Sequence, residues 1–258
     1  MVFIIVGHLA TSMDIESYWG SSMYYILNGI KSFTVVAVNV YILISGYFGI
    51  RFSFNKLGKL GFEVLFYSLV FLVIFIIPHG VDRNSLSFFF PITSDIFWFV
   101  GAYFVLVVCS PFINRALLSL DVKQHGVLVI AGVLLFYFWP TVSYIFNFRQ
   151  VVDDAGYGPV NFIMLYIIGR YIRRICDKKL PIVQSWIKWS SVYLFTSLSL
   201  FLFQSLYSHL LGFSFTSLYS YNTLFVLLGA IALFMTFYNI RINSAIINNL
   251  AKNCLRLM

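Results

Sequence analysis

One histidine near the start of the chain stands in an apolar stretch, MVFIIVGHLATS. The imidazole of His8 changes its charge close to neutral pH, which suits general acid or base chemistry. Two interpretations are open. Ionisable groups inside apolar membrane segments tend to be functional, but a histidine can also be held by hydrogen bonds within a helix bundle.

The other reactive residue types form no recognisable site. No two histidines have metal-ligand spacing on one helical face, and Cys109, Cys176 and Cys254 show no paired spacing. We therefore expect no metal site and no disulfide framework. The sequence contains neither a G-x-S-x-G elbow nor a Walker A run, so a serine hydrolase or an ATP-driven pump is unsupported.

The composition indicates the medium in which these residues work. The chain has 258 residues, of which 60% are hydrophobic and 10% charged, whereas a soluble domain has roughly 45–50% apolar and ~25% charged residues. The mean hydropathy is +0.89. Long, continuous apolar runs favour spanning helices over barrel strands. We predict an all-α, polytopic transmembrane helix bundle.

Seven apolar runs have the length of a full span, and a first run at about 2–11 is too short to cross ~30 Å of hydrocarbon. The full spans are predicted at 33–50, 61–78, 96–114, 126–145, 160–176, 186–208 and 222–240. The longest outer connector is 12–32. Its Trp19, Tyr24 and Tyr25 are predicted to anchor at the headgroup level.

The basic residues indicate the orientation. Only Lys31, Arg83 and Arg149 fall on one side of the predicted spans, and the other fourteen of the 17 Lys and Arg residues fall on the opposite side. The positive-inside rule makes that basic side cytoplasmic, so both termini are predicted to be cytoplasmic. Because topology explains the net charge of +8, we expect no nucleic-acid partner.

Several stretches, in order along the chain, resemble the acyltransferase 3 family. The most distinctive is VNVYILISGYFGIRFSFNKLGKL, where Ser45-Gly46 predicts a small patch for close helix approach. It is similar to the family's second span, which reads NxFxxISGYF or FFxxSGF before a basic turn. The other stretches are FIIVGH, FWFVGAYFVLVVCSPFINRAL, MLYIIGRYIRR and YNTLFVLLGAIALFMTF.

The resemblance implies a membrane-bound O-acyltransferase. Its expected reaction transfers acetyl from acetyl-CoA to a hydroxyl of a cell-surface or lipid-linked polysaccharide, with no permanently bound cofactor. The expected partners are the lipid bilayer, acyl-CoA and a polysaccharide or glycolipid acceptor. The expected location is a cell membrane, as a multi-pass protein of the bacterial plasma membrane.

The resemblance also implies roles for particular residues. His8 matches the histidine that ends the family's first span, as general base or transient acyl carrier. Arg51, Lys56 and Lys59 stand where acyl-CoA phosphates would arrive on the cytoplasmic side, although topology alone also explains them. Lys59 or Lys56 is further expected to pair with Glu63.

The remaining candidates have strong packing alternatives. Asn39 is expected either to bind substrate or to hold two helices together. Trp98 and Tyr103 could line a path for sugar or pantetheine, although aromatic packing explains them better. Arg170, Arg173 and Arg174 resemble the other phosphate candidates, but topology is the preferred explanation.

The chain ends differ from the family pattern. The family's first span carries an Arg eleven residues before its histidine, a position upstream of Met1, and a last span follows the stretch that INNLAKNCLRLM resembles. We therefore expect one acyltransferase-like transmembrane domain, 1–258, incomplete at both termini. The alternatives are a multispan transporter or flippase for a glycan or solute, and an inactive remnant of the enzyme.

Overall fold

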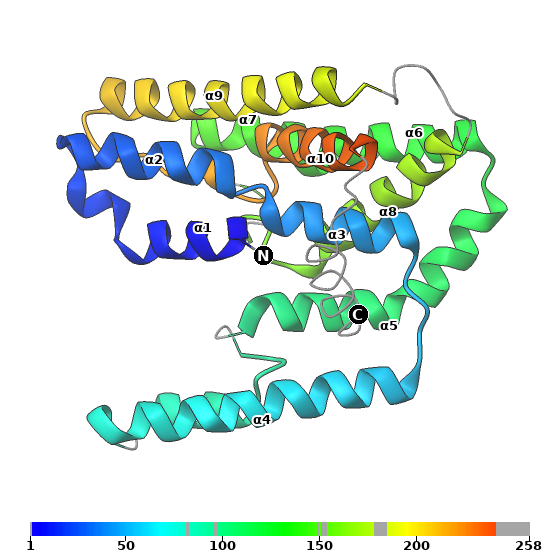
Figure 1. Ribbon diagram of the computed structural model, residues 1–258, viewed down its shortest axis with the longest axis horizontal. Coiled ribbons are helices and arrows are strands. Elements are labelled where there is room, and N and C mark those ends of the chain that lie inside the picture. The colour runs from blue at the N-terminus through cyan, green and yellow to red at the C-terminus, as the bar shows by residue number, and fades with distance from the viewer. Residues whose placement is uncertain are drawn as a thin grey trace. The chain divides into compact units, whose positions relative to one another are not determined.

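The computed structural model is all-helical over the residues that it describes, which are 2–80, 83–94, 97–148, 150, 154–177 and 185–240 (Figure 1). The α-helices are α1 (Val2–Ser12), α2 (Ser22–Thr34), α3 (Ala37–Phe48), α4 (Phe54–His79), α5 (Trp98–Ser119), α6 (Val122–Val133), α7 (Trp139–Phe146), α8 (Pro159–Cys176), α9 (Trp186–Leu211) and α10 (Leu224–Asn239). Short helical turns are η1 (Ile15–Tyr18), η2 (Arg83–Phe89), η4 (Leu134–Phe138) and η6 (Ser217–Tyr219).

Six helical segments in the described residues have the length and composition to cross a membrane. They are Ser22–Phe48, Phe54–Pro78, Trp98–Ser119, Val122–Phe146, Trp186–Leu211 and Ser217–Asn239. These correspond to six of the seven predicted spans, which confirms a multi-pass helical protein. The remaining predicted span, 160–176, is helix α8, whose three arginines keep it out of this set.

The fold leaves the predicted membrane orientation untested. The orientation of the termini stays a prediction. Some residues that entered the charge count lie outside the described part of the chain. They are Arg149, Lys178, Lys179, Arg241, Lys252 and Arg256, and the last polar stretch, 241–258 with Cys254, lies outside it too.

The predicted connector 12–32 is largely helical, which corrects the sequence-based boundary. Helix α2 begins at Ser22, where the Ser21 side chain caps it, and leads directly into α3. Tyr24 is fully buried, so its prediction as an interfacial anchor was wrong. Polar residues on the inward face of α2, such as Asn28 and Ser32, lower its hydropathy and hide the span from a sequence window.

The chain divides into two compact units, which are described separately. The first comprises Met1–Gly49 with Leu117–Asn239, and the second includes Ile50–Ala116. In the first unit, α9 lies beside α10 and α2, and α3 packs along α8 (Figure 1). In the second, the Ser68 hydroxyl of α4 donates to the Phe88 carbonyl of η2 at 2.7 Å.

Helices α3 and α8 touch backbone to backbone. A Cβ added at Gly46 would lie 2.5 Å from the Tyr166 carbonyl oxygen, and one at Gly169 would lie 2.5 Å from the Leu43 carbonyl oxygen. Only glycine fits at both places, as expected where membrane helices pack through small residues. The predicted small patch at Ser45-Gly46 is confirmed, and its partner is Gly169.

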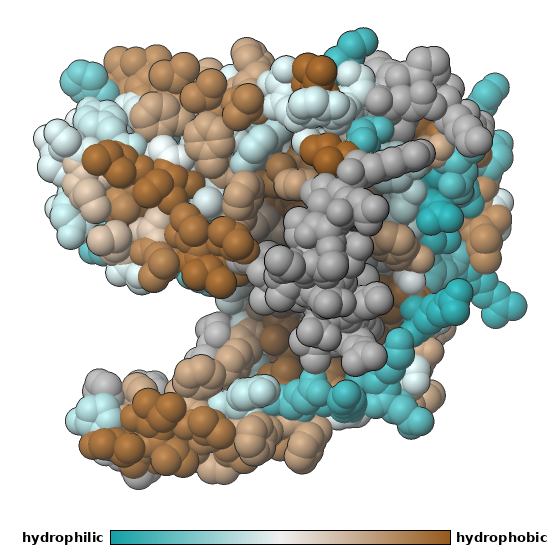
Figure 2. Space-filling view, in the orientation of Figure 1, coloured by the Kyte–Doolittle hydropathy of each residue, from teal (hydrophilic) through white to brown (hydrophobic). Residues whose placement is uncertain are grey.

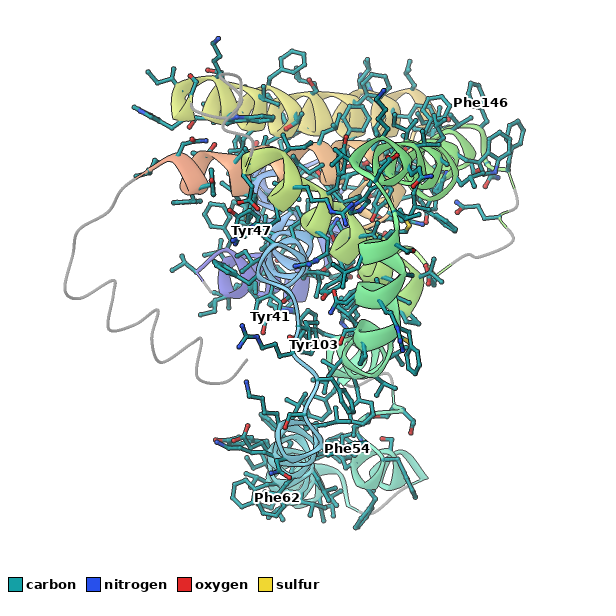
Figure 3. The ribbon with its side chains drawn as sticks, turned by 90° about the vertical axis from the view of Figure 1, so that its right-hand side faces the viewer. Tyr41, Tyr47, Phe54, Phe62, Tyr103 and Phe146 are labelled. Carbon is teal, nitrogen blue, oxygen red and sulfur yellow. The ribbon has the colours of Figure 1, made fainter. Side chains whose placement is uncertain are left out.

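Hydrophobic side chains cover much of the outer surface, as an apolar surrounding requires. Figure 2 shows them over α1 and α4. Phe54 and Phe62 project from α4 (Figure 3), and both are more than two-thirds exposed, at 79% and 70%. A soluble protein would not present apolar patches of this size.

Candidate active site

His8 lies on the exposed side of α1. Gly7 approaches Thr34 of α2, since a Cβ on Gly7 would lie 3.2 Å from the Thr34 hydroxyl oxygen. One turn later Ala10 is buried in a cluster with Tyr24 and Leu27. These contacts seat α1 on α2 and leave the imidazole exposed, with no hydrogen bond or ion pair to any described residue. The packing interpretation of His8 therefore gains no support.

Asn39 makes a hydrogen bond that joins two segments, as its packing interpretation predicts, and its role in substrate binding stays a prediction. The side chain is fully buried in α3, and its Nδ2 donates to the Tyr221 carbonyl at 2.8 Å. That bond ties α3 to the segment before α10. The amide oxygen Oδ1 has no partner among the described residues, and could accept a hydrogen bond from a ligand.

A polar cluster surrounds the segment that Asn39 holds, and the sequence did not reveal it. Tyr137 Oη donates to Asn161 Oδ1 at 2.7 Å, and Asn161 Nδ2 donates to the Gly156 carbonyl at 2.9 Å. The Tyr221 N–H donates to the Ala155 carbonyl at 2.9 Å. One backbone hydrogen bond thus joins the loop before α8 to the segment before α10, and Asn161 fixes the same loop from α8.

Local backbone features position this cluster. Tyr137 belongs to η4, a π-helical turn between α6 and α7, and such turns often occur at functional sites. Ala155 and Gly156 have φ of 51° and 78°. A Cβ at Gly156 would lie 2.5 Å from the Asn222 nitrogen, so both the angle and the space require glycine there. In the sequence, the turn-forming stretch DDAGYGP was the one signal that could have indicated this cluster.

The predicted phosphate-binding residues belong to the second unit. Arg51, Lys56 and Lys59 are all exposed. Lys59 Nζ lies 3.7 Å from a Glu63 carboxylate oxygen, which confirms the predicted pair. Arg51 and Lys56 have no ion pair among the described residues, so their charges are available to an anionic ligand.

Trp98 and Tyr103 also belong to the second unit and take part in an aromatic row along α5. Trp98 meets Phe99 edge to face at 5.9 Å between ring centroids, and Phe99 stacks on Tyr103 at 6.0 Å. Both side chains are half-buried. Their geometry agrees with the packing interpretation. The predicted site residues thus form two groups, with His8 and Asn39 in the first unit and the others in the second.

The arginines of α8 have local structural partners. Arg174 donates to the Leu117 and Leu120 carbonyls at 2.6 and 2.9 Å, where α5 ends. Arg173 pairs with Asp177 at 3.2 Å and lies 5.1 Å from the ring centroid of Tyr47, which packs on α10 (Figure 3). These contacts support roles beyond membrane topology, in helix capping and packing.

His125 is a second histidine of a different kind. Its side chain is fully buried near the start of α6, where Asp121 and Gln124 form a capping box. Nε2 lies 3.1 Å from the Ile167 carbonyl of α8, and Nδ1 has no partner among the described residues. The ring meets Tyr171 edge to face at 5.1 Å. His125 therefore joins α6 to α8, whereas the His8 side chain is exposed.

Comparison with known proteins gives one match. The family model described as an acyltransferase domain, of the acyltransferase 3 type, matches residues 1–256. No curated protein and no solved structure matches the chain.

Proposed function

The chain belongs to the acyltransferase 3 family, and from that premise we propose that it transfers acetyl from acetyl-CoA to a hydroxyl of a cell-surface or lipid-linked polysaccharide. The match over residues 1–256 carries the proposal, because it covers every candidate residue. The six spanning helices support a multi-pass enzyme. We place it in a bacterial plasma membrane, where cytoplasmic acetyl-CoA and an outer glycan would meet.

His8 acts as general base in the proposed reaction. Its imidazole takes the proton from the acceptor hydroxyl while the hydroxyl oxygen attacks the thioester carbonyl. The C–S bond then breaks, and the departing CoA thiolate takes the proton from the imidazolium. The His8 ring is exposed and has no hydrogen-bond partner within the described ranges, which supports this role.

The other candidates bind the two substrates. Arg51 and Lys56 attract the CoA phosphates, since exposed guanidinium and ammonium groups without carboxylate partners bind phosphate well. Lys59, which is paired with Glu63, adds a further positive charge beside them. Asn39 Oδ1 accepts a hydrogen bond from the bound substrate, while its Nδ2 keeps α3 in register. Trp98 and Tyr103 present aromatic surface along α5.

Labelled transfer tests the proposal. Membrane vesicles containing the chain are given [¹⁴C]acetyl-CoA, and base-labile label on polysaccharide is measured. We expect acetyl transfer above that of vesicles lacking the chain, and a KM for acetyl-CoA that rises several-fold in Arg51→Ala. Absence of chain-dependent transfer would reject the enzyme and leave the transporter or the inactive remnant.

Acid-quenched protein separates the two roles of His8. A transient acyl carrier would leave labelled acetyl on the wild-type chain when acceptor is withheld, and none on His8→Ala. A general base would leave none on either protein.

A further inference from the structure

Lys31 is a cation that the topology of the protein does not explain. It is one of only three basic residues on the predicted outer side, which the positive-inside rule leaves poor in Lys and Arg. It lies within the candidate span Ser22–Phe48, and its side chain is half-buried. Ionisable side chains held at such positions are functional candidates by default.

The immediate surroundings of Lys31 are aromatic rather than acidic. Its Nζ lies 5.0 Å from the ring centroid of Tyr219 in η6. No carboxylate of the described residues lies within 4.0 Å of it. The acid that acts on it electrostatically is Glu16, whose Oε1 accepts a hydrogen bond from the Thr216 hydroxyl at 3.1 Å. The ammonium donors thus remain available to a ligand.

Buried hydrogen bonds fix the aromatic platform under Lys31. The Tyr219 hydroxyl lies 3.0 Å from the Asn28 carbonyl and 2.9 Å from Asn28 Oδ1. One turn earlier on α2, the Tyr24 hydroxyl donates to Ser208 of α9 at 2.8 Å. All these side chains are nearly or fully buried. A charge presented on a preorganised platform loses little freedom on binding, which favours recognition over adventitious attraction.

The position of Lys31 relates it to the proposed acceptor chemistry. Thr34, one turn after Lys31, is the residue that Gly7 approaches, and His8 follows Gly7. Lys31 thus lies on α2 one turn before the residue that α1 approaches, and His8 lies on α1 beside the glycine that approaches it. An acceptor that spans these two packed helices could bring its charged group to Lys31 and its hydroxyl to His8.

We propose that Lys31, presented on Tyr219, binds the anionic group of the acceptor, so that the acceptor is an acidic glycan carrying a carboxylate or a phosphate. This inference rests on the proposed function only where it identifies the bound molecule as the acceptor. The binding site itself requires only Lys31, Tyr219 and their contacts.

Ligand-dependent thermal stability of the purified full chain tests the site without any reaction. The probes are glucuronate, glucose 1-phosphate, inorganic phosphate and uncharged glucose. We expect a saturable rise in Tm with an anionic sugar, at a Kd about tenfold or more below that of glucose. Glucuronate and glucose 1-phosphate distinguish a sugar carboxylate from a sugar phosphate, and inorganic phosphate shows whether the sugar is needed.

Variants assign the effect to one side chain. Lys31→Met keeps the apolar stem and should abolish the preference for the anionic sugar, whereas Lys31→Arg should retain it. Lys188→Met, at an exposed lysine of α9, is the matched control and should behave as wild type. A preference that survives in Lys31→Met would overturn the proposal.

If Lys31→Met does not fold, the ligand preference of the wild-type protein still tests the proposal. Equal Tm shifts with glucuronate, glucose 1-phosphate and glucose would contradict an anion site. Acetyl transfer, measured in parallel, bears only on the proposed function: transfer without anion preference rejects the Lys31 site alone, and anion binding without transfer rejects the enzyme alone.

Discussion

Two helix contacts of the first unit use polar and small residues in opposite ways. Between α3 and α8, Gly46 and Gly169 bring the two backbones together, and the neighbouring Ser45 hydroxyl is satisfied by the Tyr41 carbonyl of its own helix at 3.1 Å. Between α2 and α9, the Tyr24 hydroxyl donates to Ser208, and one turn before Ser208 the Gln204 side chain is fully buried with neither amide atom partnered among the described residues.

The difference separates a contact made for rigidity from one that holds unused hydrogen-bonding capacity. A buried polar atom without a partner costs about 1–3 kcal/mol, which a purely structural interface has no reason to bear. The α2–α9 contact therefore keeps unused hydrogen-bonding capacity in the helix pair that also carries Lys31, the residue for which we propose an anion site. The α3–α8 contact is the frame that holds Asn39 and the arginines of α8.

The largest effect is expected from alanine at the glycine contact. Gly169→Ala places a Cβ 2.5 Å from the Leu43 carbonyl oxygen, so α3 and α8 must separate, at a cost of about 1–3 kcal/mol. Gly29→Ala in α2 is the control, since its Cβ would meet nothing within 4 Å. Thermal unfolding in detergent compares the two variants. Equal stability would show that the helices do not touch there.

Removal of one buried hydroxyl tests the α2–α9 contact. Tyr24→Phe deletes the donor to Ser208 and should lower stability by about 1–2 kcal/mol. Tyr25→Phe, at the adjacent and 44% exposed tyrosine, should change stability little. The same measurement of unfolding applies. If the two variants lose equal stability, Tyr24 is not the buried partner of Ser208.

Gln204→Leu tests whether the buried Gln204 amide, which has no partner among the described residues, lowers the stability of the fold. The leucine is similar in size and needs no hydrogen bonds, so stability should stay equal or rise by up to about 1 kcal/mol. Unfolding in the absence of added ligand is the measurement. A loss larger than about 1 kcal/mol would mean that Gln204 already has a partner, such as ordered water.

The smallest effect on stability is expected outside both contacts, at Lys59. Its pair with Glu63 is exposed, so Lys59→Met should change the free energy of unfolding by less than about 0.5 kcal/mol. The same variant should raise the KM for acetyl-CoA, because it removes a cation from the proposed phosphate site. A large loss of stability with an unchanged KM would reverse this assignment.

The sequence predicted those features that depend on local pattern. The helical class, the Lys59–Glu63 pair and the small patch at Gly46 all follow from spacing along one segment, and the structure confirms them. The start of the second span was wrong, because α2 turns Asn28 and Ser32 inward and so lacks a continuous apolar run.

Features that join distant segments were beyond such patterns. The donor of Asn39 meets a carbonyl 182 residues away, and the partner of His125 is a backbone group of α8. Both partners are backbone carbonyls, and because every residue has one, no residue type in the sequence marks them as partners. Their roles could be assigned only from the packing of α3, α6 and α8.

Acetyl transfer by His8→Ala tests the central claim most directly, with His209→Ala as the control at another exposed histidine. Both variants and the wild type are assayed with [¹⁴C]acetyl-CoA in the same membrane vesicles, at matched protein amounts. The account predicts loss of at least about 100-fold in rate for His8→Ala, as for removal of a general base, and a rate near wild type for His209→Ala. Undiminished transfer by His8→Ala would contradict it.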